Sequence, residues 1–179
     1  MTRATSRPAV STLCIRSSWG PIRVAARCGK VVSCDLPELG AEPHKPFRWL
    51  GSKSAATPSD RRVLEQAVRF VRRALAGRAG RPPPFEWPKA TPFTLRVWRA
   101  LAGIPRGEVL EYGALAGRIG RPGGSRAVGR ACGANPLPIF IPCHRVLPND
   151  GSLGGFSAGL PWKRLLLERE RGAVGAARA

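Results

Sequence analysis

The sequence is poor in acidic residues and in histidine. Asp and Glu number 11 against 30 Lys and Arg, and two of the 179 residues are His, so the formal net charge is +19. A positive excess of this size favours a polyanion as partner, because such a field usually serves to neutralise phosphates. Nucleic acid is the leading interpretation and an anionic membrane surface the second. Arg supplies 25 of the 30 cations, and with many Ala, Gly and Pro it is also typical of a GC-rich genome.

Long apolar runs and paired cysteines are also missing. No run approaches the roughly 20 apolar residues of a membrane span, and the first ten residues lack the apolar segment of a secretory signal. The five cysteines include no C-x-x-C pair, and an odd number does not suit a disulfide framework. We therefore expect a cytoplasmic protein with no membrane segment and with free thiols. The hydrophobic content of 43% excludes disorder throughout.

The first part of the chain predicts a small antiparallel sheet. Residues 10–16, 22–26 and 31–36 are β-prone runs that turn-forming residues separate. Residues 37–58 show no periodicity and are interpreted as a loop.

A helix is expected next, because apolar residues recur at helical spacing from Leu64 to Leu75. Ser59 is the expected N-cap, and Gly77 ends the helix. The proline-rich segment 77–88 is the best linker candidate, so we expect an N-terminal domain over residues 1–88 and a C-terminal domain over residues 89–179. The outer face of the helix carries Arg69, Arg72 and Arg73.

The second part predicts mostly helices. Thr91 and Pro92 form a capped helix start, and two short helices at residues 112–119 and 125–132 are joined by a glycine-containing turn. With arginines around the second helix, this pair resembles a helix-turn-helix, although a plain helical hairpin has the same spacing. A last helix over residues 161–171 precedes a tail expected to be frayed, residues 172–179. The expected fold class is α+β, a small antiparallel sheet with one helix followed by a helical domain.

Cys143 is the candidate nucleophile. It follows an apolar run at residues 139–141, interpreted as a strand, and Pro142, and it is flanked by His144 and Arg145. Such neighbours favour a thiolate, whereas the alternative is a small buried cysteine. Glu170 on the last helix could orient His144 as a third member. Adjacent side chains on a strand point to opposite faces, so direct contact between Cys143 and His144 is not expected. A relaying water or a turn at the motif would be needed to connect them.

A series of motifs between residues 91 and 170 extends this signature. The chain contains Phe93-Thr94 with Val97-Trp98, Ile104-Pro105-Arg106-Gly107, Tyr112-Gly113-Ala114-Leu115-Ala116, Arg126-Ala127-Val128-Gly129, Asn135-Pro136, Ile141-Pro142-Cys143-His144-Arg145-Val146 and Gly154-Gly155-Phe156-Ser157. In these motifs the chain resembles the O6-alkylguanine-DNA alkyltransferase family, also called methylated-DNA-protein-cysteine methyltransferases. The first 88 residues resemble the family only loosely, through Trp19-Gly20-Pro21-Ile22 and the helix after Ser59.

The resemblance implies a single-turnover repair enzyme that needs no cofactor. Cys143 would attack the alkyl carbon on O6 of a damaged guanine, and O4-alkylthymine is a second candidate substrate. His144, through water and with Glu170 behind it, would deprotonate the thiol. Tyr112 would contact the base near N3 and supply a proton to the departing guanine.

The resemblance also implies how DNA is bound. A monomer would enter the minor groove of double-stranded DNA with the second helix of the helix-turn-helix and flip the alkylated base out. Arg126 would take the place of the extruded nucleotide, and the small Ala127 and Gly129 would allow close approach. Asn135 resembles the family's hinge residue, which holds the helix-turn-helix against the cysteine segment.

The expected substrate pocket contains Cys143, Val146, Phe156 and Ser157. Phe156 stands where several relatives have Tyr, so an aromatic wall is kept and a hydroxyl contact is lost. Glu111 stands where relatives often have Ser or Thr. No structural metal is expected, because three cysteines and the second histidine do not match the zinc positions of relatives: Cys14, Cys28, Cys34 and His44. Cys132 is interpreted as a packing residue.

Three other functions each account for only part of the sequence. A non-catalytic module that binds alkylated bases and flags them for another pathway would need no cysteine, so Cys143 argues against it. A basic helix-turn-helix regulator leaves the Pro-Cys-His-Arg signature unexplained. A cysteine hydrolase leaves the basic charge unexplained.

Overall fold

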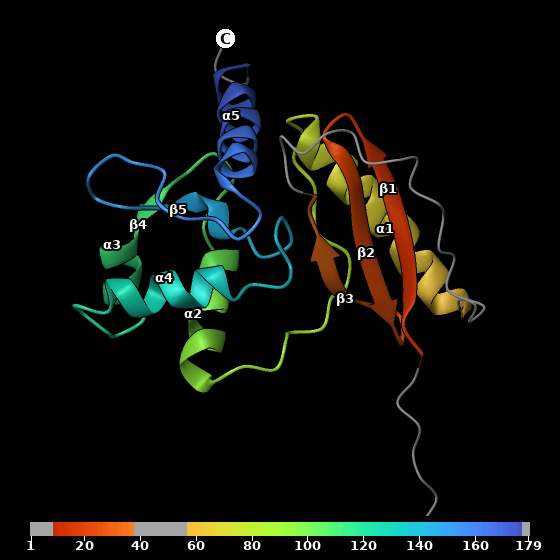
Figure 1. Ribbon diagram of the computed structural model, residues 1–179, viewed down its shortest axis with the longest axis horizontal. Helices are drawn as coiled ribbons and strands as arrows, with labels where there is room; N and C mark the ends of the chain where they lie inside the picture. The colour runs from red at the N-terminus through yellow and green to blue at the C-terminus, as the bar shows by residue number, and fades with distance from the viewer. Residues whose placement is uncertain (1–8, 38–56, 177–179) are drawn as a thin grey trace, which may run out of the picture.

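The computed structural model describes residues 9–37 and 57–176. The amino-terminal part is an antiparallel sheet of strand order β1-β2-β3, formed by β1 (Ser11–Ser17), β2 (Gly20–Arg27) and β3 (Lys30–Asp35) (Figure 1). The hairpin between β2 and β3 turns at Cys28 and Gly29, which both have positive φ, as a two-residue hairpin loop requires. The predicted sheet is confirmed. The predicted loop falls almost entirely on residues 38–56, which lie outside the described residues.

Helix α1 (Pro58–Leu75) covers one face of this sheet. Its N-cap is Thr57, whose hydroxyl accepts a hydrogen bond from the Asp60 amide, so the expectation of Ser59 as N-cap is wrong. Pro58 explains the difference, because proline suits the first helical position and starts the helix before Ser59. The buried Asp60 carboxylate accepts bonds from the Ser11 hydroxyl and the Gly29 amide, which fixes the helix to the sheet. The three arginines expected on the outer face are exposed, namely Arg69, Arg72 and Arg73.

The proline-rich segment after α1 runs along the edge of β3. The Val31 amide donates to the Pro84 carbonyl at 3.0 Å, and the Val31 carbonyl accepts from the Glu86 amide at 2.8 Å. Phe85 and Trp87 pack against the hydrophobic core. The segment interpreted as a linker is therefore held against the sheet, and the domain boundary at residue 88 stays a prediction.

The remaining chain is mostly helical, as predicted (Figure 1). The Thr91 hydroxyl caps α2 (Pro92–Ala102) by accepting a hydrogen bond from the Thr94 amide. The short helices α3 (Tyr112–Arg118) and α4 (Ser125–Gly133) pack against each other and on α2. Two-residue strands β4 and β5 pair in parallel, which brings the start of α3 beside the Cys143 segment. The elements are α2 (Pro92–Ala102), β4 (Leu110–Glu111), α3 (Tyr112–Arg118), α4 (Ser125–Gly133), the 3-10 turn η1 (Cys143–Arg145), β5 (Val146–Leu147) and α5 (Leu160–Ala176).

Two details of this part differ from the prediction. Residues 139–141 form a turn with Ile139 at a φ of 73°, and the interpretation as a strand is wrong. An apolar run of this length is compatible with any buried backbone, and here the chain turns within the core, where Phe140 and Ile141 are buried. Helix α5 continues to Ala176, so residues 172–176 are helical and not part of a frayed tail. The other three tail residues lie outside the described residues.

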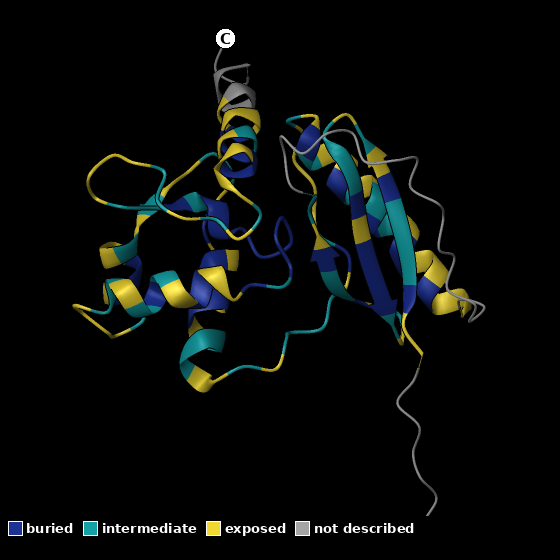
Figure 2. Cartoon of the chain, viewed as in Figure 1, coloured by how far each residue is buried: buried dark blue, intermediate teal, exposed yellow. Residues whose placement is uncertain are grey.

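The buried residues form one continuous core across both parts (Figure 2). The Cys34 amide of β3 donates to the Pro136 carbonyl at 3.0 Å, and the indole of the fully buried Trp162 donates to the Pro37 carbonyl at 2.5 Å. These bonds tie the sheet to the segment before Cys143 and to α5. In the part of the chain that the structure describes, no helix combines the length and apolarity of a membrane span.

The capping correction is testable by substitution. Thr57→Ala is expected to lower the free energy of unfolding by about 1 kcal/mol, because it removes the acceptor for the Asp60 amide. Ser59→Ala is the matched control and is expected to change it by less than about 0.5 kcal/mol. Urea unfolding of both variants measures the difference. A larger loss in Ser59→Ala than in Thr57→Ala would restore Ser59 as the cap.

Candidate active site

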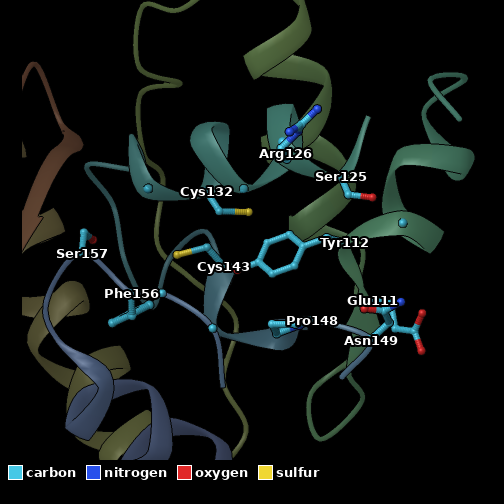
Figure 3. Close-up of a pocket in the computed structure, with 15 residues that line it drawn as sticks. Glu111, Tyr112, Ser125, Arg126, Cys132, Cys143, Pro148, Asn149, Phe156 and Ser157 are labelled. Atoms are coloured by element: carbon cyan, nitrogen blue, oxygen red, sulfur yellow. The ribbon is translucent and has the colours of Figure 1, made fainter. Parts of the chain in front are cut away.

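A pocket of about 660 Å³ opens beside α3 and α4, with Cys143 in its wall (Figure 3). The segment 148–157 closes the opposite side. Of the residues predicted from the sequence, Tyr112, Arg126, Gly129, Cys143, Phe156 and Ser157 line it. The remaining lining residues are Glu111, Gly113, Ser125, Cys132, Gly133, Pro148, Asn149, Gly154 and Gly155.

The Cys143 thiol is held by Asn135, which follows α4. The Asn135 side-chain amide donates to Cys143 Sγ at 3.1 Å and to the Ile141 carbonyl at 2.8 Å, and its oxygen accepts from the Leu137 amide at 3.0 Å. Asn135 and Cys143 are both buried. One side chain thus fixes the end of α4, the buried turn and the sulfur relative to one another.

The resting sulfur is a thiol. Burial raises the pKa of Cys143 above its ordinary value, and the hydrogen bond from Asn135 and the charge of Lys163 oppose this rise only in part. The expectation that flanking residues would favour a thiolate is therefore wrong. Burial is the main reason, and the Arg145 guanidinium bonds to Glu170 and the Ile104 carbonyl, so it does not stabilise a thiolate. A base is needed to remove the proton.

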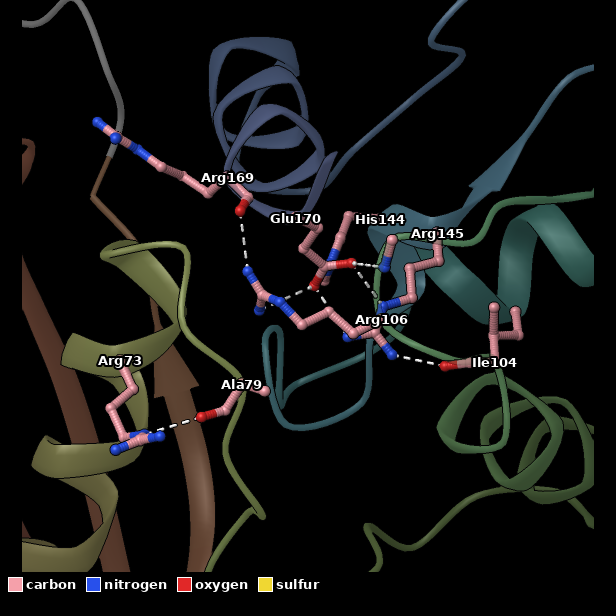
Figure 4. Close-up of polar contacts among 9 residues, drawn as sticks. Arg73, Ala79, Ile104, Arg106, His144, Arg145, Arg169 and Glu170 are labelled. Carbon is pink, nitrogen blue, oxygen red and sulfur yellow. Dashed lines mark hydrogen bonds and ion pairs between the residues drawn. The ribbon is translucent and has the colours of Figure 1, made fainter. Parts of the chain in front are cut away.

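Glu170 of α5 binds polar groups from two other segments of the chain (Figure 4). His144 Nε2 lies 3.0 Å from Glu170 Oε1, and Arg145 donates to both carboxylate oxygens, at 2.8 and 2.9 Å. The Gly107 amide donates to Oε2 at 3.2 Å, and an Arg106 nitrogen lies 3.8 Å from Oε1. The structure therefore brings His144 and Glu170 together, as the sequence predicted.

The contacts of Glu170 fix the tautomer of His144. Burial raises the pKa of Glu170, but hydrogen bonds and charges from His144 and Arg145 outweigh burial and hold it well below its ordinary value. Burial lowers the pKa of His144, so at neutral pH the ring is neutral. An ionised carboxylate only accepts hydrogen bonds, so Nε2 carries the ring proton and Nδ1 keeps a lone pair. Nδ1 is buried and has no hydrogen-bond partner among the described residues.

Tyr112 begins α3 and faces the pocket (Figure 3). Burial, reinforced by the neighbouring thiols of Cys132 and Cys143, raises the pKa of Tyr112 to about 12. Its hydroxyl therefore keeps its proton at neutral pH and is a hydrogen-bond donor.

Two residues near the thiol, Lys163 and Cys132, were not among the predicted site residues. Lys163 is fully buried, donates to the Val146 carbonyl at 2.8 Å and lies with Nζ 5.7 Å from the centre of the Tyr112 ring. Val146 is itself buried and does not line the pocket. Cys132 is buried as expected but also lines the pocket. A lysine within the apolar stripe of the last helix, next to Trp162, is the signal that pointed to an inward position.

The other predicted residues lie as follows. Arg126 on α4 is exposed at the pocket, and Ala127 is half-buried outside it. A methyl group on Gly129 would meet the Tyr112 ring only at ordinary contact distance, so packing against Tyr112 does not require glycine there. Within residues 9–37 and 57–176, no three His, Cys, Asp or Glu residues gather as a metal site, and His44 lies outside the described residues.

The Glu170 network predicts an acid-dependent contribution to stability. Because the pKa of Glu170 in the folded protein lies below its unfolded value of 4.5, the contribution is complete above about pH 4.5 and is lost as the pH falls towards the folded pKa. Glu170→Gln is expected to lower the free energy of unfolding at pH 7 by about 3 kcal/mol, and the difference from the parent protein shrinks in acid. Urea unfolding from about pH 7 to pH 3 measures this.

Glu168→Gln is the control, since Glu168 is exposed on the same helix. A loss for Glu170→Gln that stays constant from neutral pH to pH 3 would contradict the network.

Known proteins resemble this chain in sequence and in structure. Residues 92–172 match the family described as 6-O-methylguanine DNA methyltransferase, DNA binding domain. A methylated-DNA–protein-cysteine methyltransferase of Salmonella typhimurium is 52% identical over 80 residues, 45% of this chain and 47% of that protein, so the match spans about half the length of this relative.

Solved structures extend the match over most of the chain. The O6-methylguanine methyltransferase of Mycobacterium tuberculosis is 33% identical with a TM-score of 0.74, over 92% of this chain and 94% of the other. A structure of OGT from the same organism in complex with DNA has 33% identity and a TM-score of 0.73, over 90% and 93%. The fold and this similarity over nearly the full length establish that the chain belongs to the methylated-DNA–protein-cysteine methyltransferase family.

Proposed function

We propose that this protein repairs O6-alkylguanine in DNA by transferring the alkyl group to its own Cys143, once per molecule. One observation carries the proposal: a buried thiol lies in the wall of a pocket beside α3 and α4, and the next residue, the neutral His144, is hydrogen-bonded to the ionised Glu170. The family relatives named as methyltransferases support it. O4-alkylthymine is a second candidate substrate, because its alkyl group is also carried on an exocyclic oxygen.

The reaction is an in-line displacement. A new bond forms between Cys143 Sγ and the alkyl carbon while the bond from that carbon to O6 breaks, so the electron pair leaves with guanine. The thiol proton passes through a bridging water to His144 Nδ1, the buried nitrogen with a free lone pair. Glu170 then stabilises the imidazolium. No cofactor takes part, because guanine is the leaving group and S-alkylcysteine the stable product.

Tyr112 assists the leaving group. Its hydroxyl keeps its proton at neutral pH and donates to the base near N3, where negative charge develops. Cys143 releases one proton and guanine gains one, so the overall reaction is balanced.

The substrate reaches the pocket as a flipped base. The alkylated oxygen is buried within a duplex, and extruding a base costs a few kcal/mol. Helix α4 enters the minor groove of double-stranded DNA, Arg126 fills the vacated stack, and the small Ala127 and Gly129 allow close approach. One chain acts as a monomer. The DNA complex of the Mycobacterium tuberculosis relative supports DNA as the partner.

Residues around the thiol position these groups. Asn135 holds the sulfur against the end of α4 through the bonds described above. Phe156 and Ser157 line the pocket together with Cys132 and Cys143, and Val146 holds Lys163 through its carbonyl. The alternative, a module that binds alkylated bases without reacting, leaves the thiol and the buried His144–Glu170 pair without a purpose.

Intact-protein mass after mixing with O6-methylguanine duplex tests the proposal. We expect a gain of about 14 Da, carried by the Cys143 peptide, because a methyl group replaces the thiol hydrogen. Repaired guanine is expected to plateau at about one per protein molecule. Cys143→Ala is the control: it removes transfer, stays folded with a stability loss of roughly 1 kcal/mol or less, and still binds the duplex.

Several outcomes would contradict the proposal. Continuing turnover without a second enzyme would exclude a stable thioether. Transfer to another residue, Cys132 included, would identify a different nucleophile. A folded Cys143→Ala variant that no longer binds DNA would mean that binding and transfer are not separate roles.

A further inference from the structure

A second groove lies away from the alkyl-transfer pocket, between α1 and the segment 80–87. Its volume is about 850 Å³. Its lining contains three arginines, three aromatic residues and three consecutive prolines: Arg69, Arg73 and Arg81, then Phe70, Phe85 and Trp87, then residues 82–84. No carboxylate lines it among the described residues. Two acidic residues are adjacent in sequence to lining residues: Glu86 pairs with Arg27 at 3.1 Å, and Glu65 is exposed on α1 outside the lining.

The arginines are arranged along one side of the groove. Arg69 and Arg73 are four residues apart on α1 and therefore share a face of the helix. Arg73 Nε donates to the Ala79 carbonyl at 2.8 Å, which holds its guanidinium over the segment while its outer nitrogens remain available (Figure 4). Arg69 and Arg81 are exposed and make no ion pair within the described residues.

Contacts with neighbouring residues hold the three aromatic side chains of the groove in place. Phe70 packs on Phe140 with ring centres 5.1 Å apart, and Phe85 meets the edge of Trp87 at 5.0 Å. Phe85 is fixed further by its backbone bridge to Val31 of β3. The three aromatic residues are half-buried, so each keeps part of its surface exposed.

Rings beside a row of unpaired guanidinium groups match one kind of ligand. Single-stranded nucleic acid binds where cations follow the phosphates and aromatic side chains stack on the bases. Duplex DNA keeps its bases stacked inside the helix and does not offer them to a floor of rings. We propose that this groove is a second nucleic-acid site, which binds a segment of single-stranded DNA. It lies outside the alkyl-transfer pocket, and the two share no lining residue.

The fluorescence of Trp87 reports on this groove directly. An oligothymidylate of about 12 nucleotides is titrated into the parent protein and into Trp87→Phe, with the pocket beside α4 occupied by excess unmodified duplex. We expect quenching in the parent protein that is absent in Trp87→Phe. Quenching of equal size in both proteins would overturn the proposal, because the oligonucleotide would then lie elsewhere.

A charge-matched pair of variants tests the arginines. Arg69→Glu with Arg81→Glu changes the groove, and Arg61→Glu with Arg62→Glu makes the same change in net charge at exposed α1 positions outside it. We expect oligothymidylate affinity, measured by fluorescence anisotropy, to fall roughly tenfold more in the groove variant. Equal losses would mean that only the overall charge matters.

The same two variant proteins distinguish a failure of this inference from a failure of the proposed function. Both are expected to unfold at the same temperature as the parent and to accept a benzyl group from free O6-benzylguanine at the same rate. Loss of transfer in all proteins would count against the repair reaction, whereas loss of oligothymidylate binding confined to the groove variant supports the second site alone.

Discussion

One buried carboxylate, Glu170, determines the geometry of the candidate active site. It receives hydrogen bonds from the 3-10 turn that carries Cys143 and from the loop before β4, although it belongs to the last helix. A buried charge is tolerated only when it is paired and fully hydrogen-bonded, so these partners and Glu170 require one another. The same contacts that hold three distant segments together also determine which ring nitrogen of the neutral His144 carries the proton. Stability and chemistry therefore depend on one set of bonds.

Much of the fold was predictable, because it depends on local patterns. Alternating strands with glycine turns, helical spacing of apolar residues and the Thr91–Pro92 cap all act over a few residues, and the corresponding elements are present. The errors arose where a local pattern had two solutions. Thr57 and Ser59 both suit an N-cap, and Pro58 decided between them. The run at residues 139–141 suits a strand or a buried turn, and only tertiary packing selects the turn.

The sequence predicted which residues form the candidate site better than it predicted their protonation states. Cys143, His144 and Glu170 follow from the motif and the resemblance, and the structure places the last two in contact. The state of the thiol does not follow from its neighbours in sequence, since Arg145 turns away and burial raises the pKa. Lys163 lies 20 residues from Cys143 along the chain, and its approach to the thiol depends on how α5 packs. Burial of this kind is a property of the assembled core.

The central claim is that burial keeps His144 neutral and that Glu170 holds its proton on Nε2, which leaves a lone pair on Nδ1. Nitrogen-15 NMR of the imidazole rings at neutral pH measures this directly, and His44→Gln removes the chain's other histidine signal. The account predicts a protonated Nε2 and an unprotonated Nδ1 for His144 in the DNA-free protein. A proton on Nδ1, either in the opposite tautomer or in an imidazolium ion, would contradict it, because His144 would then have no lone pair at the buried nitrogen to receive the proton of Cys143.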